Sequence, residues 1–207
     1  MQTNKLPVCN TNIRLPAAMK ITDDVAMRLG LFRKDWLHLQ LLVEETLGMV
    51  RAMTDGFEGK FWLEYEGRIC YICLEVETSM DLDRKDQLIA LSTSGKNASR
   101  KGFMGKIADI IENSLLFYDD VGLLQAKYGT QAVPIEPVGA GFGEEAMIVP
   151  VWSLNEYKQN LAPEEERAEN SEAWDELEKS IVAKLSDDVI VGIKKNKASF
   201  TIVKKFE

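Results

Sequence analysis

Residues 26–53, AMRLGLFRKDWLHLQLLVEETLGMVRAM, decide how the chain folds. Gly30 lies near the start of this stretch, and a glycine at such a place is typical of the residue that follows a helix. We therefore expect one helix over residues 21–29, with Thr22 as its N-cap ahead of two aspartates. A second, longer helix is expected over residues 33–53.

The second helix has a regular apolar pattern. Its large apolar side chains recur every three or four positions, which places them on one face of a helix; they are Phe32, Trp36, Leu39, Val43, Leu47 and Val50. Three further leucines widen this face, so we expect the helix to be well buried. Two adjacent carboxylates, Glu44 and Glu45, lie in its middle.

A β-hairpin is expected after this helix. Apolar residues alternate over residues 60–66, whereas residues 68–77 are more continuously apolar, as in a central strand. Glu66-Gly67 is a two-residue turn signal between them. A short first strand is expected at residues 12–15, where Pro16 would end it.

The rest of the chain predicts further elements of the same domain. They are a polar, glycine-bearing loop over residues 92–106, a helix over 103–116, a strand over 147–152, an acidic linker over 163–178, a helix over 172–185, and a hairpin of 189–193 with 199–203. About 30 residues after the linker are too few for an independent domain. We therefore expect residues 1–207 to form one domain, with the last helix and hairpin returning to the main sheet.

The composition limits the classes of partner. The 207 residues are 45% hydrophobic and 28% charged, with a net charge of −8. An acidic balance argues against nucleic acid or an anionic membrane as a partner, because both require clustered Lys and Arg. No apolar run approaches the ~18 residues that span a bilayer, and the first residues lack the apolar core of a signal peptide. We therefore expect a cytoplasmic protein.

Cysteine and histidine do not predict a metal site. Cys70 and Cys73 are three apart in an expected strand, so their side chains should point to opposite faces. A zinc site would need two further ligands, and only Cys9 and the single histidine, His38, remain. Buried structural cysteines are the simpler interpretation. His38, on an apolar helix, is also interpreted as structural, with a general base or a metal ligand as the alternatives.

The order helix, carboxylate, hairpin resembles the Bergerat (histidine-kinase-like) ATP-binding fold, and within it the bacterial anti-sigma-factor serine kinases. The resemblance covers residues 12–112 and 172–205, and leaves residues 117–170 as an insertion of unknown fold. It implies an α/β (α+β) architecture. This is a two-layer sandwich in which helices pack mainly on one face of a mixed β-sheet.

The resemblance assigns the catalytic role to Glu45, which would polarise the attacking group. In that family an asparagine four residues later holds the magnesium that bridges the nucleotide phosphates. Met49 stands at that position here, or Gly48 if Glu44 is the aligned glutamate. ATP is therefore the candidate cofactor, and Mg²⁺ has no side-chain ligand on this helix.

The resemblance also implies nucleotide contacts beyond the helix. In the family, an aspartate accepts a hydrogen bond from the adenine amino group. Glu75, or alternatively Glu77, occupies the corresponding position here. A glycine-bearing loop and the N-terminus of the helix after it would contact the phosphates; the corresponding residues are Gly95, Lys96, Asn97, Gly102 and Gly105.

Together, these features predict a regulatory module that binds a nucleotide or a protein, with little or no catalysis. An active form would be an ATP-dependent serine/threonine protein kinase or an ATPase. A protein of the sigma-factor-regulation type and a second copy of the chain are the candidate partners. The alternatives are a protein-interaction module on the same fold that binds no nucleotide, and a sensor or enzyme for another anionic small molecule.

Overall fold

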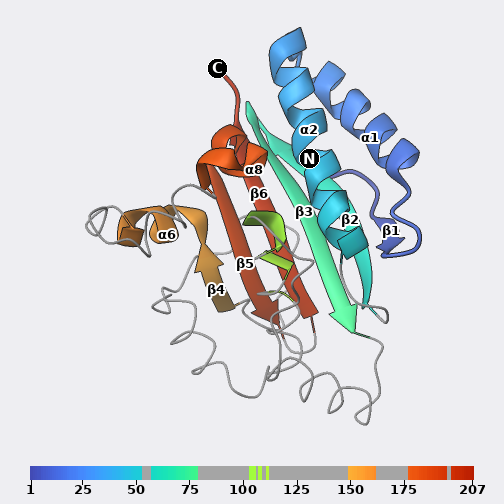
Figure 1. Cartoon of the computed structure of the whole chain (residues 1–207). Coiled ribbons are helices and arrows are strands. Elements are labelled where there is room, and N and C mark those ends of the chain that lie inside the picture. Colours follow the sequence, from blue (N-terminus) through green and yellow to red (C-terminus); the bar gives the residue numbers. More distant parts are fainter. Residues whose placement is uncertain are drawn as a thin grey trace, which may run out of the picture.

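The computed structural model describes residues 1–52, 57–78, 103–105, 107–108, 111, 149–161, 177–194 and 197–207. In this part of the chain, an α+β fold is built on a six-stranded sheet with the order β1-β2-β3-β6-β5-β4. Helices α1, α2 and α8 cover one face of the sheet (Figure 1). The elements are β1 (Leu6–Cys9), α1 (Leu15–Arg28), α2 (Arg33–Ala52), β2 (Phe57–Glu66), β3 (Ile69–Thr78), β4 (Val149–Ser153), α6 (Leu154–Leu161), α8 (Ile181–Leu185), β5 (Asp188–Lys194) and β6 (Lys197–Lys205).

The start of the chain differs from the expectation. The predicted strand at residues 12–15 is wrong, because the first strand is β1 and Pro16 stands in the first turn of α1. Proline fits that turn, since its missing N–H would have no helical partner there. The predicted N-cap, Thr22, instead lies buried inside α1, where its hydroxyl donates to the Ala18 carbonyl at 2.8 Å.

The long helix forms where the apolar pattern predicts it, but it is less buried than expected, because Phe32, Leu37 and Leu41 of the predicted apolar face are exposed. Leu39, Leu42 and Leu47 of α2 are completely buried against the sheet and its neighbours. Two polar contacts tie α2 to α1. Trp36 Nε1 and Gln40 Nε2 both donate to Asp23 Oδ1, at 2.8 and 2.9 Å.

The predicted mixed sheet is wrong, because every strand pair that the structure describes is antiparallel. A single crossover helix would bring the next strand in parallel to the first. Here two successive helices, α1 and α2, connect β1 to β2, so the chain returns in the opposite direction. The β2–β3 and β5–β6 pairs are hairpins, which are antiparallel by construction.

The hairpin between β2 and β3 is confirmed, with its turn displaced by one residue. The turn residues are Gly67 and Arg68 rather than Glu66 and Gly67, since Glu66 pairs with Ile69. Gly67 has φ +57°, a conformation that a residue with a Cβ adopts at a cost. The last hairpin is also confirmed and returns to the main sheet, because β6 pairs with β3.

Part of the predicted insertion, residues 117–170, joins the sheet. Residues 149–161 form β4 and α6, and β4 pairs with β5 at one edge. Trp152 of β4 is fully buried, with its ring centroid 5.9 Å from that of Phe103 and 5.7 Å from that of Tyr157. The helices in the described ranges include none that is long and apolar enough to cross a bilayer.

Candidate functional site

Glu45 lies on one flank of α2. At about 100° per residue it is about 180° around the helix from Trp36, which bonds to α1. The Glu45 side chain therefore projects from the side of α2 that is turned away from α1, and the residue is half-buried. The neighbouring Glu44 is exposed.

The residues one turn after Glu45 carry no side-chain oxygen. Met49 is buried in the core, and Gly48 has neither a side chain nor any neighbouring atom within 4 Å of the place where a Cβ would stand. Mg²⁺ requires oxygen ligands at near-octahedral geometry. Among the described residues, no group of three or more His, Cys, Asp or Glu is arranged to hold a metal ion. Gly48 and Met49 therefore supply no side-chain oxygen ligand for Mg²⁺.

Glu75 lies on the other side of the sheet. Its neighbours Leu74 and Val76 both belong to the core under the helices, and successive side chains of a strand point to opposite faces. Glu75 and Glu77 consequently project from the face away from α2. The structure does not bring Glu45 and Glu75 together into one site.

An ion-pair cluster engages Glu75 and Glu77. The ammonium of Lys197 in β6 lies 3.1 Å from Glu75 Oε1 and 3.2 Å from Glu77 Oε2. The hydrogen bond to Glu75 is the main cause that raises the pKa of Lys197 above its ordinary value. These contacts are sufficient to explain why two glutamates stand side by side on β3.

The predicted phosphate loop falls mostly outside the described residues. Gly95, Lys96, Asn97 and Gly102 lie outside them, so the structure does not place these residues. Gly105 is described as a half-buried helical residue. Phe103, Ile107, Ala108 and Ile111, which surround it in sequence, pack in the same core as α2.

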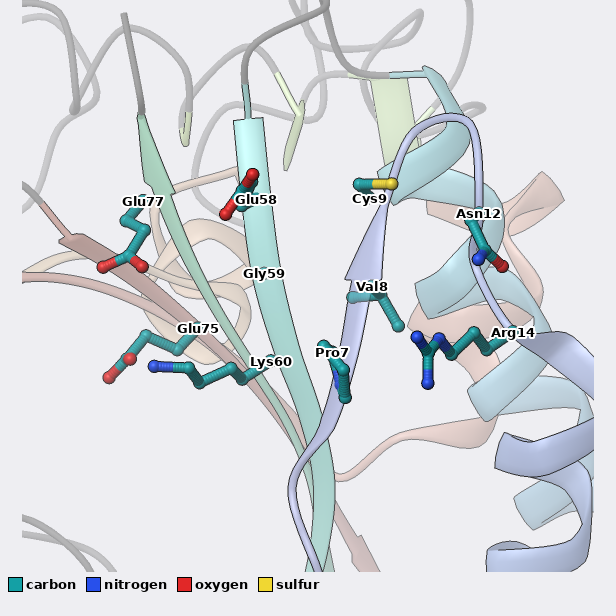
Figure 2. Close-up of a pocket in the computed structure, with 10 residues that line it drawn as sticks. All are labelled: Pro7, Val8, Cys9, Asn12, Arg14, Glu58, Gly59, Lys60, Glu75 and Glu77. Carbon is teal, nitrogen blue, oxygen red and sulfur yellow. The ribbon is translucent and has the colours of Figure 1, made fainter.

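Glu75 does line a pocket, together with residues that the sequence did not indicate (Figure 2). The pocket has a volume of about 250 Å³ and lies at the edge of the sheet formed by β1. Its lining consists of Pro7, Val8, Cys9, Asn12, Arg14, Glu58, Gly59, Lys60, Glu75 and Glu77. The hairpin pattern did not give this grouping, because the predicted turn at Glu66-Gly67 would set Glu58 opposite Glu75, whereas the observed turn sets it opposite Glu77.

The charges across the hairpin are only partly compensated. Lys60 stands opposite Glu75, and Figure 2 shows the two side chains pointing toward one another. Glu58 stands opposite Glu77, whose carboxylate also lies 3.2 Å from the Lys197 ammonium. Like charges across a strand pair destabilise it, and Lys197 offsets part of that repulsion on the Glu77 side.

A thiol and a guanidinium occupy the β1 side of the pocket. Cys9 Sγ lies 3.3 Å from Thr11 Oγ1, and this hydrogen bond is the main cause that lowers the pKa of the Cys9 thiol. Arg14 is exposed, and its backbone has φ 49° at the start of α1. The pocket therefore presents both signs of charge, which suits a polar ligand that also carries both.

The two cysteines of β3 are not a reactive pair. Cys70 faces the helices, while Cys73 lies on the opposite face, as the strand spacing predicts. Burial raises the pKa of the Cys70 thiol to about 12 and raises that of Cys73 as well. Both thiols stay protonated near neutral pH and are unreactive. His38 is half-buried on α2, and its structural role stays a prediction.

Comparison with family models, with curated proteins and with solved structures finds no match to this chain. The class of protein is therefore defined by its own residues. It is an α+β protein in which helices cover one face of an antiparallel sheet, and a charged pocket lies at the edge formed by β1.

Proposed function

We propose that the chain is a regulatory binding module with little or no catalysis, and that its ligand is another protein. The observation that carries the proposal is the separation of Glu45 and Glu75 onto opposite sides of the sheet. A nucleotide site of the anti-sigma-factor kinase type needs both functions in one cleft. Regulation of the sigma-factor type is the class of partnership that the resemblance supports.

The pocket at β1 is the proposed contact surface. A lysine or arginine side chain of the partner would bind the Glu58 carboxylate, beside the ion pair that Glu77 makes with Lys197. An acidic group of the same partner would meet Lys60 or Arg14, which line the same pocket. Such complementary charges contribute more to specificity and to the association rate than to affinity.

The first experiment separates protein binding from nucleotide binding. Thermal unfolding is measured with ATP, ADP and an AMP analogue, each with and without Mg²⁺. A ligand at one hundred times its dissociation constant stabilises the fold by about 2.7 kcal/mol, which is readily measured. The proposal expects no magnesium-dependent shift. A shift with MgATP that is lost in Glu45→Gln would contradict it.

A second experiment tests the pocket. The tagged chain, Glu58→Lys and the control Lys20→Glu are used to purify partners from an extract under identical conditions. Lys20 is an exposed residue of α1 that does not line the pocket. A protein that binds the original chain and the control but not Glu58→Lys supports the proposal. Equal recovery by all three places the contact elsewhere.

ATP binding without turnover is the second candidate. It is favoured by Glu45, which is half-buried on the flank of α2 turned away from α1. In this case ATP would stabilise the chain without Mg²⁺, and Glu45→Gln would remove little of that effect. The thermal titration described above distinguishes the two candidates directly.

A further inference from the structure

The start of the chain lies as a strip along one edge of the sheet. Residues 1–9, which we call the N-terminal strap, run beside β2 and include β1. Among the described strands, β1 stands at the edge with β2 as its neighbour. Thr3 N donates to the Leu63 carbonyl at 2.9 Å, and Tyr65 N donates to the Met1 carbonyl at 2.8 Å. Main-chain hydrogen bonds therefore attach the strap along most of β2.

Few side chains of the strap are buried. Val8 is the one residue of this described segment that is buried, and Leu6 is half-buried, whereas Met1 is 84% exposed. Pro7 also lacks the N–H group with which an ordinary strand residue pairs. Segments with few buried apolar contacts open at a lower free energy than the rest of a fold. We therefore expect the strap to leave β2 as a unit while the core stays folded.

A tight turn of an unfavourable kind connects the strap to α1. Cys9 N donates to the Asn12 carbonyl at 3.2 Å, and Asn12 N donates to the Cys9 carbonyl at 3.0 Å. Asn10 and Thr11 between them form a two-residue loop, and such loops favour turn types with a positive φ. Arg14 is the one non-glycine residue of the described chain with a positive φ, so neither loop residue has one. A turn without a positive φ splays the two segments that it joins.

We propose that the N-terminal strap exchanges between two copies of this chain, so that the strap of each copy pairs with β2 of the other. Ile13, just after the turn, is buried in the core, so the movement is confined to Asn10 and Thr11, which straighten. The second copy offers the same β2 edge in the same register. Every contact of the strap therefore forms again in a two-fold dimer. The two hydrogen bonds of the turn are lost, and the unfavourable turn is removed with them.

The edge of β2 is a surface that a second strap fits. A strand edge without its neighbour is a template for pairing with another chain. The strap also makes side-chain contacts that the exchange preserves: Lys5 Nζ lies 4.1 Å from the centroid of the Trp62 ring, and Val8 packs in the core. In the exchanged dimer, Pro7 and Cys9 of one copy line the pocket of the other. The inference does not rest on the proposed function, because exchange is measured without a partner protein.

The natural Cys9 provides a direct test of exchange. Cys9 stands opposite Glu58 of β2, and its own N–H and C=O both bond to Asn12. Cys9 and Glu58 are therefore a non-hydrogen-bonded pair, whose Cα atoms lie about 4.5 Å apart. This separation is within the range that a disulfide bridges. The substitution Glu58→Cys consequently allows a disulfide with Cys9 wherever the strap lies on β2.

Two chains that each carry one of these two thiols are mixed. One is the original chain and the other is the double variant Cys9→Ser with Glu58→Cys, so neither forms this disulfide within itself. The mixture is kept at about 500 μM, diluted to about 1 μM and oxidised with diamide. We expect a covalent dimer, in which mass spectrometry of the peptides shows a disulfide between Cys9 and position 58. Cys9→Ser with Glu44→Cys, which places an exposed thiol on α2, is the matched control and should give no such dimer.

Two changes to the turn should shift the exchange in opposite directions. Thr11→Gly creates an Asn-Gly loop, which favours a turn with positive φ and so stabilises the closed strap; introduced into both chains, it should remove most of the covalent dimer. Deletion of Asn10 and Thr11 leaves no loop with which the strap could reverse onto its own β2. In sedimentation velocity this deletion variant should be a dimer even at about 1 μM.

Three results overturn the inference. The first is a mixture that gives no more covalent dimer than the Glu44→Cys control. The second is a Thr11→Gly pair that cross-links as strongly as the chains without it, and the third is a folded deletion variant that stays a monomer. Circular dichroism verifies that each variant folds, and the cross-linking result decides the matter by itself if the deletion variant does not.

Discussion

The substitution Gly59→Ala tests how closely the strands approach at the pocket. A Cβ at this position would stand 3.0 Å from the Glu75 carbonyl oxygen, 3.3 Å from Val8 Cγ2 and 3.4 Å from Leu74 Cδ1. The nearest atom is backbone in the centre of β3, and it cannot move aside without distorting the sheet. Residues of β1 and β3 therefore both lie so close to the Gly59 backbone that they leave little room for a side chain.

The expected magnitude combines two opposing effects. Replacing Gly by Ala reduces the entropy of the unfolded chain and stabilises by about 0.4–1 kcal/mol. Overpacking of a buried position costs about 1–3 kcal/mol. The balance is a loss of about 1–2 kcal/mol, which corresponds to a decrease in Tm of about 2–8 °C for a chain of this size.

Gly48→Ala is the matched control, because the same methyl group meets no atom there. In the middle of an exposed helix face it should raise stability by about 1 kcal/mol. Thermal and urea unfolding measure both variants. If Gly59→Ala is as stable as the original chain, the close approach of the strands is refuted.

Three further predictions concern the charged face and the thiols. Glu58→Gln should raise the free energy of unfolding by about 0.2–1 kcal/mol, because it removes the repulsion from the opposing carboxylate; an unchanged urea midpoint would contradict this. Lys197 has a raised pKa, so its stabilising ion pairs are fully present below its ordinary value of 10.5 and are lost as the pH rises through the folded pKa. Lys197→Met should therefore lose less stability above about pH 10.5 than the original chain does. At pH 8, Cys9 should react with a thiol reagent rapidly and Cys70 only on unfolding, and Cys9→Ser should abolish the fast phase.

The local sequence determined the elements of this protein. The three-to-four-residue apolar period predicted α2, and alternation around a glycine turn predicted the β2–β3 hairpin; both are confirmed. The spacing of Cys70 and Cys73 predicted that the two thiols point apart, because the period of a strand is two residues wherever the strand lies. These patterns depend only on local geometry, so they can be predicted from the sequence directly.

Only the tertiary structure decided strand direction and the grouping of the charges. The sheet is antiparallel rather than mixed; the sequence predicted both helices before β2, and the mixed sheet was implied by the resemblance alone. Pro16 was interpreted as the end of a strand, although it begins α1, because proline fits either place and the surrounding contacts choose. Glu45 and Glu75 are both acidic and both near the expected site, yet the sheet separates them. Which face of the sheet a side chain occupies depends on which face the helices cover, and that is a property of the whole fold.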